Sequence, residues 1–163
     1  MKKAAILFFT ASVFFLILII FVFFQFNDSR LHLVVCNVGQ GDAIFIRTPR
    51  QADILIDGGP DKKVLDCLSR HMPFWDRSLD LVIMTHPDAD HSTGLIDVIQ
   101  RYHVSNFYTE AVPGRTDVYK LLKLVLADKN LSARYLHSGK VLNEGSGFRI
   151  KTLWPSTGAI EST

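Results

Sequence analysis

The sequence predicts a layered α/β domain with a mixed β-sheet, preceded by one membrane-spanning helix. Two observations lead to this prediction. The segment from Ala4 to Phe24 contains no charged residue, and its only polar residues are Thr10 and Ser12. The rest of the chain alternates short β-rich runs with amphipathic helical patterns, in an order that begins β-β-β-α-β-α-β-α and ends with further β-rich runs. Such an order is typical of a layered α/β domain.

The apolar segment predicts a transmembrane anchor over residues 4–26. It exceeds the roughly 18 apolar residues that indicate a spanning helix, and also the ~7–15 residue apolar core of a signal peptide. A cleaved signal peptide is the alternative, because Lys2 and Lys3 form a basic start. The bulky stretch 21–26 offers no small-residue cleavage site. The positive-inside rule places the two lysines in the cytoplasm and the chain from Asn27 onward outside it, so we expect a single-pass cell-membrane protein.

The remaining residues, about 137, suit one domain, which we assign to 31–163. All 16 acidic residues and all basic residues except Lys2 and Lys3 follow the anchor, so this part is formally neutral. It lacks the basic surplus of a nucleic-acid-binding domain. Cys36 and Cys67 could form a disulfide outside the cytoplasm, but each falls in an apolar pattern. We therefore favour two buried free thiols that act as small hydrophobic side chains.

The periodicity of apolar residues places the individual elements. The β-rich runs are Leu31–Val35, Ala43–Arg47, Asp53–Ile56, Leu79–Thr85, Asn106–Thr109, Ala133–Leu136, Lys140–Leu142 and Phe148–Leu153. The helical patterns cover Asp61–His71, Leu95–Tyr102 and Thr116–Asp128, and Ser92 or Thr93 is placed to cap the second of them. The run 79–85 is almost continuously apolar, which is typical of a strand buried on both faces. A turn is expected at 143–147.

Four potential metal ligands follow that buried strand: His86, Asp88, Asp90 and His91. They lie between the C-terminal end of the strand and a helix, which is where open α/β sheets place ligands. Imidazole and carboxylate suit zinc, manganese or iron. The alternative is a polar loop in which Asp90 or Ser92 caps the helix. Two histidines and two aspartates at this spacing favour the metal site.

Three motifs together carry a resemblance to a known family. The segment Thr85-His-Pro-Asp-Ala-Asp-His91, followed by Gly94, resembles the THxHxDH signature of the metallo-β-lactamase superfamily, with Asp88 in place of the usual second histidine. With the upstream motifs Val38-Gly-Gln-Gly-Asp-Ala43 and Leu55-Ile-Asp-Gly-Gly59, the pattern is similar to the soluble domain of ComEC-type competence proteins and its stand-alone relatives. Those competence proteins move DNA across the bacterial membrane.

The resemblance implies a metallo-β-lactamase-like αββα sandwich of two similar halves. The length of this chain corresponds to the first half and the start of the second, and a later ligand aspartate of the family is not found in it. We therefore expect the domain to be incomplete at its C-terminus.

The resemblance also implies a role for each candidate residue and two divalent metal ions, zinc foremost and manganese as an alternative. His86 and Asp88 would hold one ion, and Asp90 and His91 the other. Asp57 would stand behind the ligands and orient a histidine, unless it is only a turn residue before two glycines. Asp42 would line the site.

The activity that the resemblance implies is metal-assisted hydrolysis, in which Asp90 orients the attacking water. A membrane-anchored hydrolase acting on phosphodiesters is the first hypothesis. A DNA-uptake component and a metal-binding or vestigial domain without turnover are the alternatives, because fold alone does not fix function.

Overall fold

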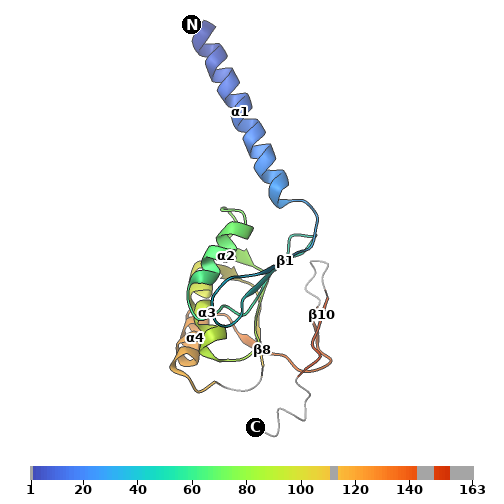
Figure 1. The fold of residues 1–163 in the computed structure, drawn as a ribbon, viewed down its shortest axis with the longest axis vertical. Coiled ribbons are helices and arrows are strands. Elements are labelled where there is room, and N and C mark those ends of the chain that lie inside the picture. Colours follow the sequence, from blue (N-terminus) through green and yellow to red (C-terminus); the bar gives the residue numbers. More distant parts are fainter. Residues whose placement is uncertain (1, 111–113, 143–148, 155–163) are drawn as a thin grey trace.

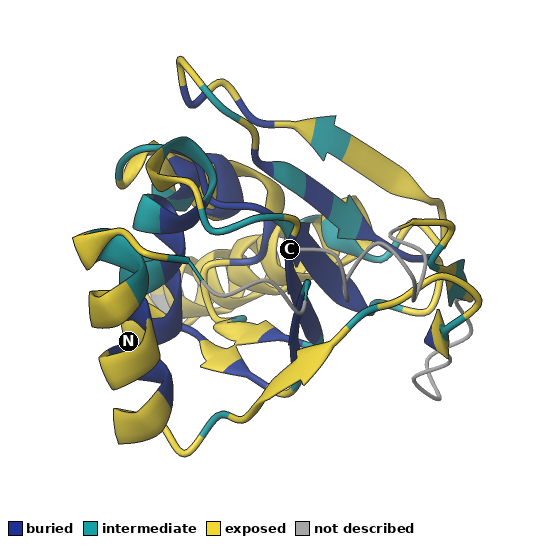
Figure 2. Ribbon diagram, turned by 90° about the horizontal axis from the view of Figure 1, so that it is seen from below, coloured by how far each residue is buried: buried dark blue, intermediate teal, exposed yellow. Residues whose placement is uncertain are grey.

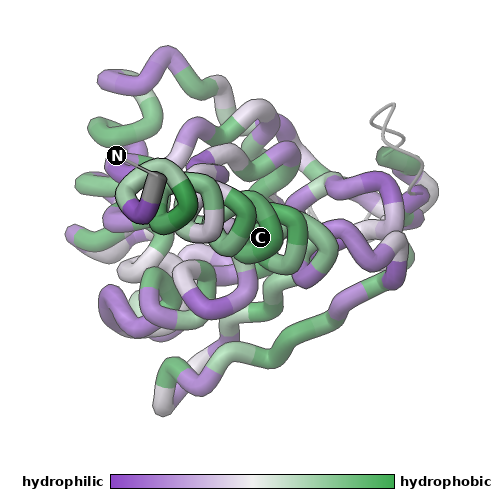
Figure 3. Tube along the Cα trace, turned by 90° about the horizontal axis from the view of Figure 1, so that it is seen from above, coloured by the Kyte–Doolittle hydropathy of each residue, from purple (hydrophilic) through white to green (hydrophobic). Residues whose placement is uncertain are grey.

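The computed structural model describes residues 2–110, 114–142 and 149–154. Its first element, α1 (Lys2–Phe26), projects away from a mixed α/β domain (Figure 1). The helix is apolar along most of its length (Figure 3), and none of the spanning window within Lys3–Phe26 is buried. The prediction of one N-terminal helix that is long and apolar enough to cross a bilayer is therefore confirmed.

The domain is built on a six-stranded sheet in the order β1-β2-β3-β5-β7-β8. Its strands are β1 (His32–Val35), β2 (Ile44–Arg47), β3 (Asp53–Ile56), β5 (Leu81–Met84), β7 (Phe107–Thr109) and β8 (Ala133–Tyr135). The first three strands pair antiparallel, and each neighbouring pair from β3 onward is parallel. The predicted mixed sheet is thus confirmed. Because β3, β5 and β7 are parallel, the segments that follow them emerge at one edge.

Three helices cover one face of this sheet (Figure 1): α2 (Lys63–His71), α3 (Ala89–Arg101) and α4 (Asp117–Asp128). The core between them and the sheet is fully apolar, with Phe45, Leu55, Val82 and Phe107 facing the helices. The central strands are accordingly buried (Figure 2). The helix α4 begins as its sequence predicts, because the Thr116 side chain accepts a hydrogen bond from the Tyr119 amide.

A short antiparallel pair, β9 (Val141–Leu142) and β10 (Ile150–Lys151), lies against the opposite face. Leu142 packs there against Leu81 and Ile83, so β5 is buried on both faces as predicted. Among the described residues, β9 and β10 cover only part of this face of the sheet. Leu33 and Val35 of β1 lie on this same face, opposite residues of β2, and their side chains are 62% and 70% exposed. The turn predicted at 143–147 lies outside the described residues.

Two predictions about local structure are wrong. The helix α3 begins at Ala89, earlier than a Ser92 or Thr93 cap would allow, and the Ser92 hydroxyl instead donates to the Asp88 carbonyl within the first turn. Leu79 belongs to a separate short strand, β4 (Ser78–Leu79), which pairs in parallel with β6 (His103–Val104). A two-residue pair has too few side chains to produce a periodic pattern.

The prediction of free thiols is also wrong, because Cys36 and Cys67 form a disulfide. Cys36 follows β1 and Cys67 lies on α2, with their Cα atoms 5.7 Å apart. Both cysteines are buried, so the apolar pattern around each was read correctly. Spacing along the chain could not show that residues 31 apart become neighbours. In the chain-entropy account, a cross-link over such a loop stabilises the fold by roughly 3–4 kcal/mol.

Candidate metal centre

The candidate site forms where β3 and β5 end side by side. Asp57 directly follows β3, and Thr85 and His86 follow β5. The Asp57 amide donates to the Ile83 carbonyl at 2.8 Å, which continues the parallel ladder by one residue. The backbone of Asp57 then turns at a φ of 58°, in the left-handed region that aspartate tolerates better than most residues. His91 approaches the same point from the first turn of α3.

The buried carboxylate of Asp57 holds these three segments together. Its Oδ1 accepts the Thr85 amide at 2.8 Å, and its Oδ2 accepts the Thr85 hydroxyl at 2.6 Å. The Oδ2 atom also accepts Nδ1–H of His91 at 3.0 Å. A carboxylate that is 2% exposed needs such donors, because burying it without them would be costly. Asp57 therefore has the orienting contacts expected of a residue behind the ligands, and it is more than a turn residue.

The same network sets the tautomers of both histidines. A carboxylate only accepts, so Nδ1 of His91 carries the proton in their hydrogen bond. The Thr85 hydroxyl already donates to Asp57, so it accepts from Nδ1–H of His86, at 2.9 Å. In its neutral form each ring thus has an unprotonated Nε2, the atom that is free to bind a metal.

Two of the four predicted ligands, His86 and His91, share a group of ligand atoms with Asp57, and Asp88 and Asp90 each lie near one of these histidines. Nε2 of His86 is 3.6 Å from Oδ2 of Asp88, and Nε2 of His91 is 3.9 Å from Oδ2 of Asp90. The two imidazole rings are 3.9 Å apart between centroids. Asp57, His86 and His91 each offer a ligand atom within 4.8 Å of the others. Two imidazoles with adjacent carboxylates match the donor set of zinc or manganese, so the residues fit such ions.

The capping alternative for this segment does not describe the structure. Asp88 is the N-cap residue of α3, but its side chain makes no capping hydrogen bond and is 69% exposed. Asp90 lies inside the first helical turn, and the Ser92 hydroxyl donates to a carbonyl instead of accepting an amide. The two aspartates are therefore not required for capping, and their carboxylates remain beside the histidines.

Close backbone contacts fix the start of α3. Gly41, at a φ of +83°, lies so near Asp90 that a Cβ atom there would overlap the Asp90 carbonyl oxygen. A Cβ on Gly94 would likewise overlap the carbonyl oxygen of Gly58. The turn that precedes β2 therefore packs against the metal-ligand segment. Asp42 follows Gly41 in this turn and is exposed, and it does not belong to the group of ligand atoms formed by Asp57, His86 and His91.

Sequence analysis missed one acidic residue near the site, Glu110. It follows β7, whose carboxyl end adjoins that of β5. Burial raises the pKa of the Glu110 carboxyl, the His86 charge opposes this shift, and Asp88 adds to it. Two of the predicted ligands, His86 and Asp88, thus influence the Glu110 carboxyl through their charges. The sequence did contain a signal for Glu110. It directly follows a predicted strand, and ligands of open α/β sheets gather at the carboxyl ends of the parallel strands. The other histidines of the domain do not belong to the ligand-atom group among the described residues.

Comparisons with known proteins add a partial likeness of fold. No protein-family model matches the sequence, and no curated protein sequence matches it. A subclass B3 metallo-β-lactamase from a soil metagenome library, MEM-A1, is 16% identical with a TM-score of 0.46, over 71% of this chain and 46% of its own. Zn²⁺-bound PqqB from Methylobacterium extorquens is 16% identical with a TM-score of 0.49, over 69% of this chain and 42% of its own.

A third similar structure is the metallo-β-lactamase SMB-1 bound to 2-mercaptoethanesulfonate, at 17% identity and a TM-score of 0.47. The match covers 71% of this chain and 47% of that protein. This chain thus spans about half the length of these proteins or less. The likeness concerns the fold alone.

The role of Asp57 predicts the effect of removing its charge. Asp57→Asn should lower zinc affinity about 10- to 100-fold, because an amide no longer fixes the His91 and Thr85 hydrogen bonds in the same way. Competition with a chromogenic chelator would measure this. Asp66→Asn, at an exposed carboxylate on α2, is the matched control and should bind as the unaltered protein does. Equal affinity in both variants would contradict the orienting role.

Proposed function

We propose that this chain is a membrane-anchored, metal-dependent hydrolase that acts on phosphodiesters. The observation that carries the proposal is the pair of histidines held by the Asp57 and Thr85 network, with both Nε2 atoms free and a carboxylate beside each. Such a network orients metal ligands before any ion binds, which is the arrangement a catalytic metal centre requires.

Each of the four candidate ligands would have a defined role in this hydrolysis. His86 with Asp88, and His91 with Asp90, would hold two divalent ions, zinc foremost and manganese as an alternative. Bound ions would supply Lewis-acid chemistry and charge stabilisation. The Asp90 side chain is 36% exposed and would accept a hydrogen bond from the attacking water and orient it. Asp88 is mostly exposed, so a substrate can approach from solvent without a rearrangement of the core.

The phosphodiester substrate class rests on the resemblance of three motifs to ComEC-type competence proteins, for which the substrate would be a DNA strand. The structure adds one consideration in favour of a larger domain. Leu33 and Val35 are exposed on the sheet face that β9 and β10 only partly cover. In an αββα sandwich a second sheet would cover this face, so the experiment below uses the protein to its natural C-terminus.

Two observations support a location of the domain outside the cytoplasm. The helix α1 is long and apolar enough to cross the membrane, and its first residues are basic. The Cys36–Cys67 disulfide requires an oxidising compartment, since cytoplasmic thiols are kept reduced.

This location predicts the state of the thiols in living cells. Alkylation with a maleimide polymer after acid quenching should leave the unaltered protein unmodified, while Cys36→Ser should gain one adduct at its remaining thiol. Non-reducing electrophoresis separates the unmodified protein from the protein that carries an adduct. Two adducts on the unaltered protein would show reduced cysteines and place the domain in the cytoplasm.

Hydrolase activity predicts that bound metal and turnover are lost together. Plasma mass spectrometry should find about two metal ions per chain. His86→Ala and Asp90→Ala should reduce hydrolysis of bis-p-nitrophenyl phosphate on the order of 100-fold or more, because each removes a ligand. His103→Ala is the matched control, since this exposed histidine follows α3 at the end away from the ligands and should retain metal and activity.

Two results would count against the proposal. Protein that binds metal but hydrolyses no phosphodiester would be a metal-binding domain without turnover. Protein that binds no metal in its natural length would remove the basis for the hydrolase assignment.

A further inference from the structure

The loop between α2 and β4 carries two large apolar side chains at the surface of the domain. Phe74 is 78% exposed and Trp75 is 52% exposed. Their rings meet edge to face, with centroids 4.8 Å apart. The residues before them, Met72 and Pro73, are buried. Two adjacent exposed aromatic rings form an apolar projection, and such a feature on a protein surface marks an interaction site.

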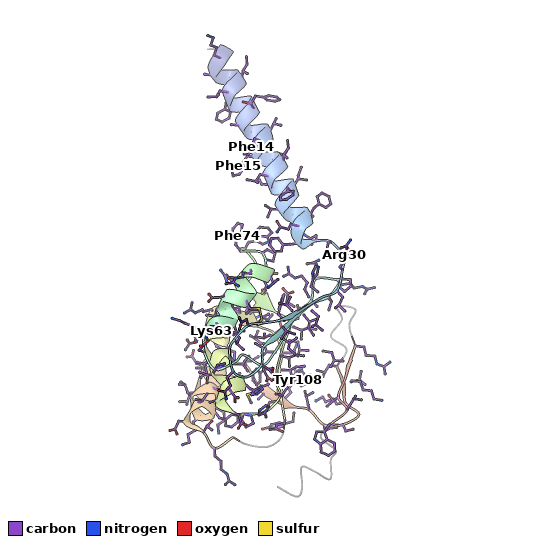
Figure 4. The ribbon with its side chains drawn as sticks, in the orientation of Figure 1. Phe14, Phe15, Arg30, Lys63, Phe74 and Tyr108 are labelled. Carbon is purple, nitrogen blue, oxygen red and sulfur yellow. A yellow bond between two sulfur atoms is a disulfide. The ribbon has the colours of Figure 1, made fainter. Side chains whose placement is uncertain are left out.

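This projection lies beside the end of α1 that joins the domain. The centroids of the Trp75 and Phe26 rings are 6.2 Å apart, and these rings also meet edge to face. A groove runs between the loop and the last turns of α1, with Ile19 and Val22 on its helix side and Phe74 and Trp75 opposite. Its walls are almost entirely apolar. Phe74 is seen next to the lower end of α1 in Figure 4.

The base of the loop is held in place by polar contacts. The Asp76 carboxylate accepts the Ser78 amide at 3.1 Å, and the Asp76 amide donates to the Pro73 carbonyl at 2.9 Å. Asp76 also lies 3.4 Å from the guanidinium of Arg47, which is itself buried against Asp53. These contacts present the two rings on a fixed loop, so their exposure reflects the folded structure of the domain.

The chemistry of the surroundings identifies the partner. Val22 and Ile19 belong to the helix that would cross the bilayer, so the opposite wall of the groove lies at the depth of the membrane. Tryptophan is enriched where the acyl chains meet the head groups. Arg70 and His71, exposed in the last turn of α2, precede the loop and would face lipid phosphates.

We propose that Phe74 and Trp75 form a second membrane contact, which inserts into the bilayer leaflet beside the end of α1, with a phospholipid acyl chain in the groove between them. This proposal rests on the anchoring role of α1 proposed above. The partner is the lipid bilayer itself.

The contact would fix the orientation of the metal centre. The strand β5 begins close after the loop and ends just before Thr85 and His86, so the loop and the ligands lie at opposite ends of this strand. A four-residue strand separates them by on the order of 13 Å. With the loop in the membrane, the site would face away from the bilayer, toward substrates in the aqueous phase.

Tryptophan fluorescence of the full chain in phosphatidylcholine and phosphatidylglycerol vesicles tests the contact. The chain has two tryptophans, so Trp154→Phe leaves Trp75 as the only one. With brominated acyl chains the Trp75 emission should lose most of its intensity, and in ordinary vesicles it should be blue-shifted and protected from iodide. Quenching by iodide with no effect of brominated lipid would overturn the proposal.

A second probe separates failure of the loop contact from failure of the anchor. Phe14 lies midway along α1 and is exposed, so Phe14→Trp in a Trp75→Phe, Trp154→Phe background reports on α1 alone. Quenching of this probe by brominated lipid, without quenching of Trp75, would reject the loop contact and leave the anchor standing. Quenching of neither would reject both proposals.

Discussion

The carboxylate of Asp57 is the constraint on which the site depends. It is buried at the end of β3 and accepts three hydrogen bonds, two from Thr85 after β5 and one from His91 on α3. A buried carboxylate that lost these donors would carry the full cost of desolvation, so the three segments are held together by a strong preference for one geometry. The two histidines are thereby held with a proton on Nδ1, and these candidate ligands have fixed positions without a metal.

Much of the fold could be predicted from the sequence because its signals are local. The apolar run of β5, the β-rich run of β2 and the helical face of α4 each lie within a few residues of chain. The candidate ligands are equally local, since His86 to His91 form one short segment. The role of Asp57 came from the resemblance, and the structure supplies the hydrogen bonds behind it.

The features that were missed all depend on distant parts of the chain. The Cys36–Cys67 disulfide joins two patterns that separately read as buried thiols. Glu110 comes near the ligands only because β7 lies next to β5 in the sheet. The first turn of α3, which begins earlier than predicted, packs closely against Gly41, and such a tertiary contact does not appear in helix propensity or cap preference. In each case the missing information was which segments, distant along the chain, become neighbours in the fold.

The central claim, that the Asp57 network leaves both Nε2 atoms free for metal, is tested most directly by the histidine tautomers. Long-range ¹H–¹⁵N correlation spectra of the metal-free protein, recorded at about pH 8 where free histidine is neutral, would distinguish them. We expect a protonated Nδ1 and an unprotonated Nε2 in both His86 and His91. A proton on Nε2 of either ring would contradict it, because that nitrogen could then not bind a metal without a change of the network.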